Sequence, residues 1–155
     1  TTVIRLTKLP AETDKKAVGA LILQSVYYAL LRQGHSEGLR GAVVIDEAHR
    51  VANLKPVELL MKEARAFGAS IMLSSQEPGD FHDSLVANAG SHLVLQVTEA
   101  RAARDAARLV VGSAKAAAAA EKVRRLQTFH ALFRNNHHPD AVEVRVTPFF
   151  ERETP

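Results

Sequence analysis

The chain has 155 residues, of which 46% are hydrophobic and 24% charged, values typical of one globular domain with a single core. No apolar run approaches the roughly 20 residues that span a bilayer, so we expect no membrane insertion by this chain. The net charge is only +3, but residues 101–155 carry ten Lys and Arg against six Asp and Glu, a surplus compatible with a polyanion partner, although a solvated basic face is its commoner cause.

The sequence also contains no cysteine, which excludes disulfides and cysteine-based zinc sites and favours a cytoplasmic location. It opens TTVIRL, without an initiator Met or a signal-like segment, and an apolar strand is expected at once. We therefore interpret the sequence as a fragment of a longer protein.

The first half of the chain alternates between strand and helix patterns. Residues 2–7 are β-branched and alternate like a strand, and residues 14–32 place apolar side chains at helical spacing. After a polar turn over 34–41, the continuous apolar run AVVI at 42–45 predicts a strand covered on both faces. Pro56 then suits the first turn of a helix that runs to about Phe67, with Gly68 as its stop.

The second half continues the pattern and ends differently. SIMLSS at 70–75 predicts a strand that QEPGD ends, HDSLVANA at 82–89 a short helix, and SHLVLQV at 91–97 another strand. Residues 99–125 are alanine-rich and helical, with a break at Gly112. Residues 128–134 and 141–149, joined by NNHHPD, predict an antiparallel hairpin. The order as a whole predicts an α/β fold with a mostly parallel sheet, helices on both faces and a C-terminal hairpin.

Polar residues follow two of the expected strands, and ligands of such sheets bind where strands end. Asp46 and Glu47 follow the first strand, and Gln76 ends the next one. One carboxylate could hold the water shell of Mg²⁺ beside the phosphates of a nucleotide, while the other orients an attacking water. A right-handed parallel arrangement would bring Gln76 beside them. Solvated acids and a turn-forming Gln are the structural alternatives.

The order and spacing of three segments resemble one ATPase superfamily. They are AVVIDEAHRV (42–51), LLMKEARAFGASIMLSSQEPGDF (59–81) and VANAGSHLVLQV (86–97). They are similar to the C-terminal half of the core of HerA/FtsK-type ATPases, which are hexameric DNA pumps with a RecA-like, three-layer fold. The resemblance covers most of the chain, and it implies ATP and Mg²⁺ as cofactors. DNA, a homo-hexameric ring and an associated nuclease are the partners it implies.

Four site residues follow from that resemblance. Asp46 and Glu47 correspond to the Walker B pair, with Asp46 holding Mg²⁺ through water and Glu47 acting on the attacking water. Gln76 corresponds to the γ-phosphate sensor. Arg65, in EARAFG, stands in the place of an arginine finger that is offered to the neighbouring subunit.

Two departures from the family pattern limit what this chain does by itself. None of the eight glycines is followed by lysine, so the chain contains no Walker A loop. We therefore expect residues 1–155 to be the C-terminal part of an ATPase domain that lacks its P-loop strand and is inactive in isolation. The second departure, TFHALF at 128–133 in place of a Gly-Glu-Ala type start, matters less.

Three alternatives remain open. A conjugation or type IV secretion ATPase of the same superfamily would carry the same site residues. A non-catalytic remnant could serve only in assembly. The literal DEAH at 46–49 points to superfamily-2 helicases, but the chain has Ser-Ser-Gln where those proteins have Ser-Ala-Thr.

Weaker patterns have simpler explanations. Arg101, Arg104 and Arg108 share one helix face and could meet phosphates or a neighbouring subunit, although a solvated face is favoured. His137 and His138 lie in a turn without a suitably spaced third ligand, so we expect no metal there. His49 is expected to support the turn after Asp46 and Glu47 rather than to perform acid–base chemistry.

Overall fold

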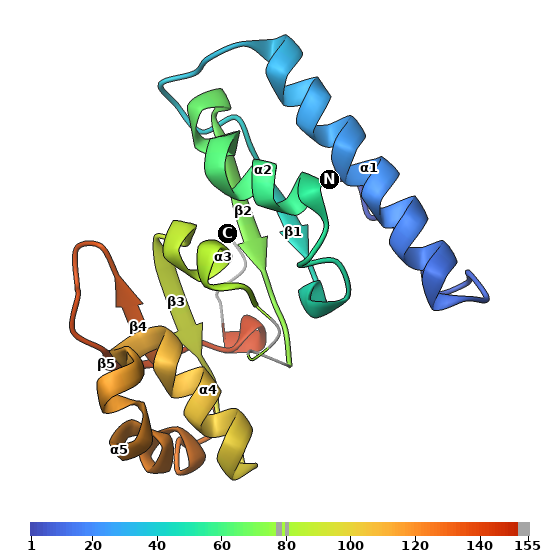
Figure 1. The fold of residues 1–155 in the computed structure, drawn as a ribbon. Helices are drawn as coiled ribbons and strands as arrows, with labels where there is room; N and C mark the ends of the chain where they lie inside the picture. Colours follow the sequence, from blue (N-terminus) through green and yellow to red (C-terminus); the bar gives the residue numbers. More distant parts are fainter. Residues whose placement is uncertain (77–78, 80, 152–155) are drawn as a thin grey trace. The chain divides into compact units, whose positions relative to one another are not determined.

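The computed structural model describes residues 1–76, 79 and 81–151, and these form two units along the chain, Thr1–Asn88 and Ala89–Pro155. Figure 1 shows the order of their elements. Each unit has a sheet and a core of its own. Part of the break expected at 76–80 falls on residues 77, 78 and 80, which lie outside the described residues.

The first unit alternates helix and strand as expected. Its elements are α1 (Glu12–Gln33), β1 (Gly41–Ile45), the 3-10 turn η1 (Ala48–Arg50), α2 (Lys55–Glu63), the 3-10 turn η2 (Ala64–Phe67), β2 (Ala69–Leu73) and α3 (Asp83–Asn88). β1 and β2 are parallel, with Gly41 opposite Ala69 and Ile45 opposite Leu73. Pro56 lies in the first turn of α2, and Gly68, with φ of 74°, ends η2 as predicted.

The core of this unit lies on one face of its sheet. Buried residues of α1 and α2, such as Leu23, Tyr27, Val57 and Leu60, form a cluster against which Ile45, Ile71 and Leu73 pack. The opposite face carries Val44 and Met72, which are register partners and are 63% and 60% exposed. The expectation that β1 is covered on both faces is therefore wrong for the described part of the chain.

Residues 2–7 do not form the expected strand. Residues 1–6 have no regular structure, and Val3 and Ile4 are 72% and 57% exposed. A strand exists only through hydrogen bonds to a neighbouring strand, and no described strand pairs with this segment. The side chains of residues 2–7 alternate as in a strand, but no described strand pairs with the segment through backbone hydrogen bonds.

The second unit packs two helices on an antiparallel sheet. Its elements are β3 (Ser91–Val94), α4 (Ala100–Val111), α5 (Ser113–Arg124), β4 (His130–Asn135), β5 (Val142–Arg145) and the 3-10 turn η4 (Phe149–Glu151), and the strand order is β3-β4-β5. Glu99 caps α4 by accepting hydrogen bonds from the backbone N–H groups of Arg101 and Ala102. Gly112, with φ of 76°, ends that helix.

The α/β class and the C-terminal hairpin are confirmed, and the described strands form two sheets, a parallel sheet of two strands and an antiparallel sheet of three. β4 and β5 form the predicted hairpin. The strand expected at 91–97 is observed as Ser91–Val94, and it pairs antiparallel with β4, with Val94 opposite Leu132. Local periodicity predicts that a segment is a strand but not which strand it pairs with. This segment pairs with β4 in the antiparallel sheet. None of the described helices is long and apolar enough to cross a membrane.

Candidate functional site at the carboxyl ends of β1 and β2

The parallel register of β1 and β2 brings the polar residues after both strands to one edge. Ile45 lies opposite Leu73, so Asp46 and Ser74 leave the sheet side by side. The backbone N–H of Ser74 donates to the carbonyl oxygen of Ile45 at 3.0 Å, and that of Ala48 donates to Ser74 at 2.8 Å. These bonds continue the pairing past the strands, so the juxtaposition expected from the sequence is present.

Asp46 is held as an ionised, exposed carboxylate. Its Oδ1 atom accepts a hydrogen bond from the Ser74 hydroxyl at 2.5 Å and another from the backbone N–H of Glu47 at 3.0 Å. The Ser74 hydroxyl and then the Glu47 N–H lower the pKa of Asp46 below its ordinary value, because both stabilise the charged form. An ionised carboxylate is the form that can hold the water shell of a hard cation.

Glu47 follows in a strained backbone conformation. Its φ of 51° and ψ of 43° lie in the left-handed region, which non-glycine residues rarely adopt. Such strain concentrates at functional sites, where the surrounding structure holds the residue in place. The side chain of Glu47 is 37% exposed, and its Oε1 atom accepts a hydrogen bond from Nε2 of Gln76 at 3.0 Å. The two residues expected to act on the attacking water and the γ-phosphate are thus in contact.

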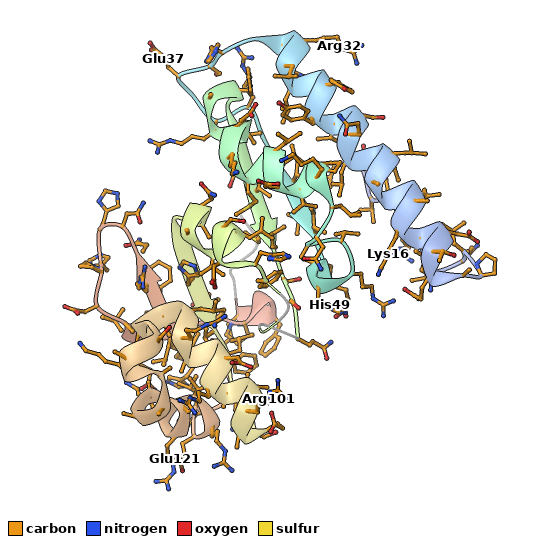
Figure 2. The ribbon with its side chains drawn as sticks, viewed as in Figure 1. Lys16, Arg32, Glu37, His49, Arg101 and Glu121 are labelled. Carbon is orange, nitrogen blue, oxygen red and sulfur yellow. The ribbon has the colours of Figure 1, made fainter. Side chains whose placement is uncertain are left out.

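His49 and Ser75 complete the link between the two strand ends. Nδ1 of His49 lies 3.2 Å from Oγ of Ser75, and Nε2 of His49 lies 3.7 Å from Oε2 of Glu47. Figure 2 shows His49 on the loop that follows β1. The sequence marked Ser74 and Ser75, with Gln76, as polar residues at a strand end, but it assigned a role only to Gln76. The signal that could have found them is the register itself, because a polar run after β2 must face the acidic run after β1.

Arg65 lies at the other end of β2 and is not brought to Asp46, Glu47 or Gln76. It is an exposed residue of η2, whereas the site follows the last residue of β2. The five residues of β2 rise about 3.3 Å each, so roughly 17 Å of strand separates the two places. The carbonyl oxygen of Arg65 accepts from the backbone N–H of Gly68 at 3.0 Å, but its side chain makes no hydrogen bond or ion pair with another described residue. Arg65 instead lines an open surface depression with Glu37. Figure 2 shows Glu37 at the far end of this unit from His49.

The weaker candidates lie in the second unit. Arg101 and Arg104 are exposed on α4 and Arg108 is half-buried, so the predicted row lies on that helix. The backbone N–H groups of His137 and His138 donate to Oδ1 of Asn135 in the turn between β4 and β5. In residues 1–76, 79 and 81–151, no group of three His, Cys, Asp or Glu side chains is placed to hold a metal ion.

A family model described as the type IV secretion-system coupling protein DNA-binding domain matches residues 8–134. The chain belongs to this family. The coupling-protein family lies within the HerA/FtsK-type ATPase superfamily that the sequence resembles, so the superfamily is confirmed. The branch that the model names is the secretion branch, which the sequence analysis held as an alternative. No curated protein matches the chain.

Solved structures of viral ATPases share the fold of the chain. The genome packaging NTPase B204 from Sulfolobus turreted icosahedral virus 2, in complex with AMPPCP, is 18% identical with a TM-score of 0.62, over 86% of this chain and 62% of that one. Its complex with ATP-gammaS is 18% identical with a TM-score of 0.62, over 94% of this chain and 66% of that one. B204, the DNA-packaging ATPase from Sulfolobus turreted icosahedral virus, is 16% identical with a TM-score of 0.63, over 96% of this chain and 74% of that one. These likenesses show a RecA-like fold, and the chain spans less than two thirds of the first two structures.

Proposed function

We propose that this chain is part of an ATP-driven DNA-translocating motor and supplies the metal-holding and water-activating side of its ATP site. The observation that carries the proposal is the linked set of Asp46, Glu47, Ser74 and Gln76 at the carboxyl ends of two adjacent parallel strands. Carboxylate and hydroxyl oxygens suit Mg²⁺, and an amide N–H suits a phosphate oxygen. One of the viral relatives is an NTPase solved in complex with AMPPCP and with ATP-gammaS, which agrees with this chemistry.

Each residue has a distinct task in hydrolysis. Asp46, ionised under the influence of Ser74, would hold the water shell of Mg²⁺. Mg-ATP supplies the γ-phosphoryl group and the cation that offsets its charge. Glu47 would accept the proton of the water whose oxygen attacks the γ-phosphorus as the bond to the ADP oxygen breaks. Gln76 would donate its amide hydrogens toward the γ-phosphate or that water.

The remaining parts of the site would come from outside this chain. A phosphate-binding loop and its lysine cradle the nucleotide in P-loop enzymes, and the sequence contains neither. We therefore propose that the full-length protein supplies this loop, and that residues 1–155 alone bind Mg-ATP weakly. Arg65, far from Gln76 along β2, would act as an arginine finger on the next subunit of a homo-hexameric ring.

DNA is the proposed substrate, and the family match supports the secretion branch. The matched family is the DNA-binding domain of type IV secretion-system coupling proteins, and the viral relatives are genome-packaging or DNA-packaging enzymes. This gives less support to a HerA-type helicase with an associated nuclease. The basic surplus of residues 101–155 fits a phosphate backbone. The lack of cysteine supports a cytoplasmic location for the motor.

The test is Glu47→Gln in the full-length protein. The amide cannot accept a proton, so hydrolysis should fall by about 10²–10⁴, while ATP binding persists because Asp46 is unchanged. ATP binding is measured by calorimetry and turnover by phosphate release. Asp14→Asn, which changes an exposed carboxylate in the first turn of α1, is the matched control and should retain wild-type turnover.

Three results would contradict the proposal. Equal loss of ATP binding and turnover in Glu47→Gln would make Glu47 a structural residue. A wild-type protein that hydrolyses no ATP would be an assembly remnant. DNA affinity should fall steeply with salt, because phosphate contacts release counterions, and an affinity that stays flat from low to physiological salt would remove DNA as the substrate.

A further inference from the structure

The imidazole of His49 lies between the two strand ends and has no part in the proposed chemistry so far. Its side chain is only 14% exposed, against 37% for Glu47. It projects from η1, which is anchored at Ala48, a residue with no exposed surface whose N–H donates to Ser74. One ring nitrogen lies near Ser75 and the other faces Glu47. The ring is therefore a fixed bridge from the end of β2 to the Glu47 carboxylate.

The contacts of the ring with Ser75 and Glu47, both described residues, favour one tautomer. If Nδ1 carried the hydrogen, the lone pair of Nε2 would face Oε2 of Glu47 across 3.7 Å, which is repulsive. If Nδ1 instead accepts from the Ser75 hydroxyl, which lies at 3.2 Å, Nε2–H faces the carboxylate. The second arrangement satisfies all three groups. Ser75 thereby sets the direction in which His49 donates.

We infer that His49 is a positioning residue that aligns the Glu47 carboxylate through its Nε2–H, with Ser75 fixing the tautomer. The inference rests on the proposed function, in which Glu47 accepts a proton from the attacking water. It adds a residue to that site without making it a proton acceptor. His49 acts on the reaction only through Glu47.

Glu47 needs the contact with His49 because Gln76, its other partner, is also proposed to bind the γ-phosphate. Oε1 of Glu47 accepts from Gln76, an exposed amide that the proposed function also directs at the γ-phosphate. When the amide turns to the phosphate, the hold on Oε1 weakens. His49 is more deeply buried and lies against Ser75 at the end of β2, so its Nε2 stays directed at Oε2. Small errors in the orientation of a reacting group can cost about 10²-fold in rate.

Two substitutions in the full-length protein separate positioning from a structural role. The amide of glutamine can take the place of Nε2, whereas the shorter amide of asparagine can take only the place of Nδ1. His49→Gln keeps the contact with Glu47 and should retain most of kcat. His49→Asn keeps only the contact with Ser75 and should lower kcat by about 10- to 100-fold, with KM for ATP unchanged. If His49 merely tied η1 to β2, the asparagine variant would be the better of the two.

Two further variants show whether His49 acts through Glu47. Adding His49→Asn to Glu47→Gln should cause little further loss of turnover, because the residue that His49 positions is already disabled. Ser75→Ala should lower kcat at unchanged KM, because the tautomer is no longer fixed. Thermal unfolding checks that each variant is folded. If His49→Asn does not fold, the Ser75→Ala result decides.

The outcomes separate this inference from the proposed function. If Glu47→Gln turns over like the wild type, or the wild type hydrolyses no ATP, the proposed function fails and the role of His49 fails with it. If Glu47→Gln is inactive while His49→Asn and His49→Gln both match the wild type, only the role of His49 is overturned. Additive losses in the double variant, or a rise in KM without a change in kcat, overturn it as well.

Discussion

The two ends of β2 differ in what holds the residues proposed to act in catalysis. At the carboxyl end, three consecutive residues each contact the segment after β1: Ser74 contacts Asp46, Ser75 contacts His49 and Gln76 contacts Glu47. At the amino end, Arg65 is exposed, and the described residues offer its side chain no hydrogen bond or ion pair. The residues at the carboxyl end are therefore held in place by contacts with one another. The guanidinium of Arg65 at the amino end is instead available to a partner outside this chain.

Arg65→Ala should have the largest effect if that partner is a neighbouring subunit. An arginine finger contributes about 10³–10⁵ in rate, so ATP turnover of the full-length ring should fall by that range while the protein stays folded. An ordinary arginine near a helix end would contribute only ~0.3–1 kcal/mol to stability, and its loss would barely change turnover. Steady-state phosphate release distinguishes the two. Arg32→Ala, an exposed arginine at the end of α1, is the matched control.

A mixing experiment tests whether Arg65 acts in trans. Subunits that carry Arg65→Ala, mixed with subunits that carry Glu47→Gln, should regain activity wherever an intact Arg65 faces an intact Glu47. ATPase rates are measured across mixing ratios. No recovery at any ratio, with Arg65→Ala alone near wild type, would leave the amino end of β2 without a catalytic role.

Gly68→Ala should have an intermediate effect, because the backbone rather than side chains shapes the amino end. Gly68 has φ of 74°, and a Cβ there would lie 2.5 Å from the carbonyl oxygen of Gly38. We expect a loss of about 1–3 kcal/mol in the free energy of unfolding, measured by urea denaturation. Gly41→Ala, at the start of β1, would meet nothing within 4 Å and is the control. Equal stability of the two variants would show that the turn before β2 tolerates a side chain.

Ser74→Ala should have the smallest effect, and it probes the carboxyl end. The Ser74 hydroxyl is the main cause of the lowered pKa of Asp46, so removing it should raise that pKa toward its ordinary value, with the Glu47 N–H still contributing. A carboxyl with a lowered pKa stabilises the fold at neutral pH, and this contribution is lost as the pH falls through the folded pKa. In Ser74→Ala the loss should begin at a higher pH.

An NMR titration of the Asp46 carboxyl carbon measures that shift directly. Ser70→Ala, an exposed serine in the same strand, is the control and should leave the pKa of Asp46 where it is. If the pKa of Asp46 does not change in Ser74→Ala, the hydroxyl does not hold the carboxylate. The cluster at the carboxyl end of β2 would then be looser than its distances indicate.

The sequence by itself determined the elements whose causes are local. Pro56 and Gly68 marked the beginning and end of the segment that forms α2 and η2, and Gly112 marked the break between α4 and α5. Capping, φ preferences and periodicity act over a few residues, so they can be read without a partner. The positions of Glu47 and Gln76 after apolar runs also predicted that they meet, because neighbouring parallel strands end at one edge.

Only the tertiary structure decided what depends on distant residues. Residues 2–7 alternate like a strand but pair with no described strand, and Ser91–Val94 pairs antiparallel with β4 rather than joining β1 and β2. The exposed face of Val44 and Met72 likewise depends on which helices reach it. The contacts of His49 and Ser75 exist only because the register sets Ile45 opposite Leu73. Periodicity shows how side chains alternate along a segment, whereas hydrogen bonds and packing across the fold choose the segment that they meet.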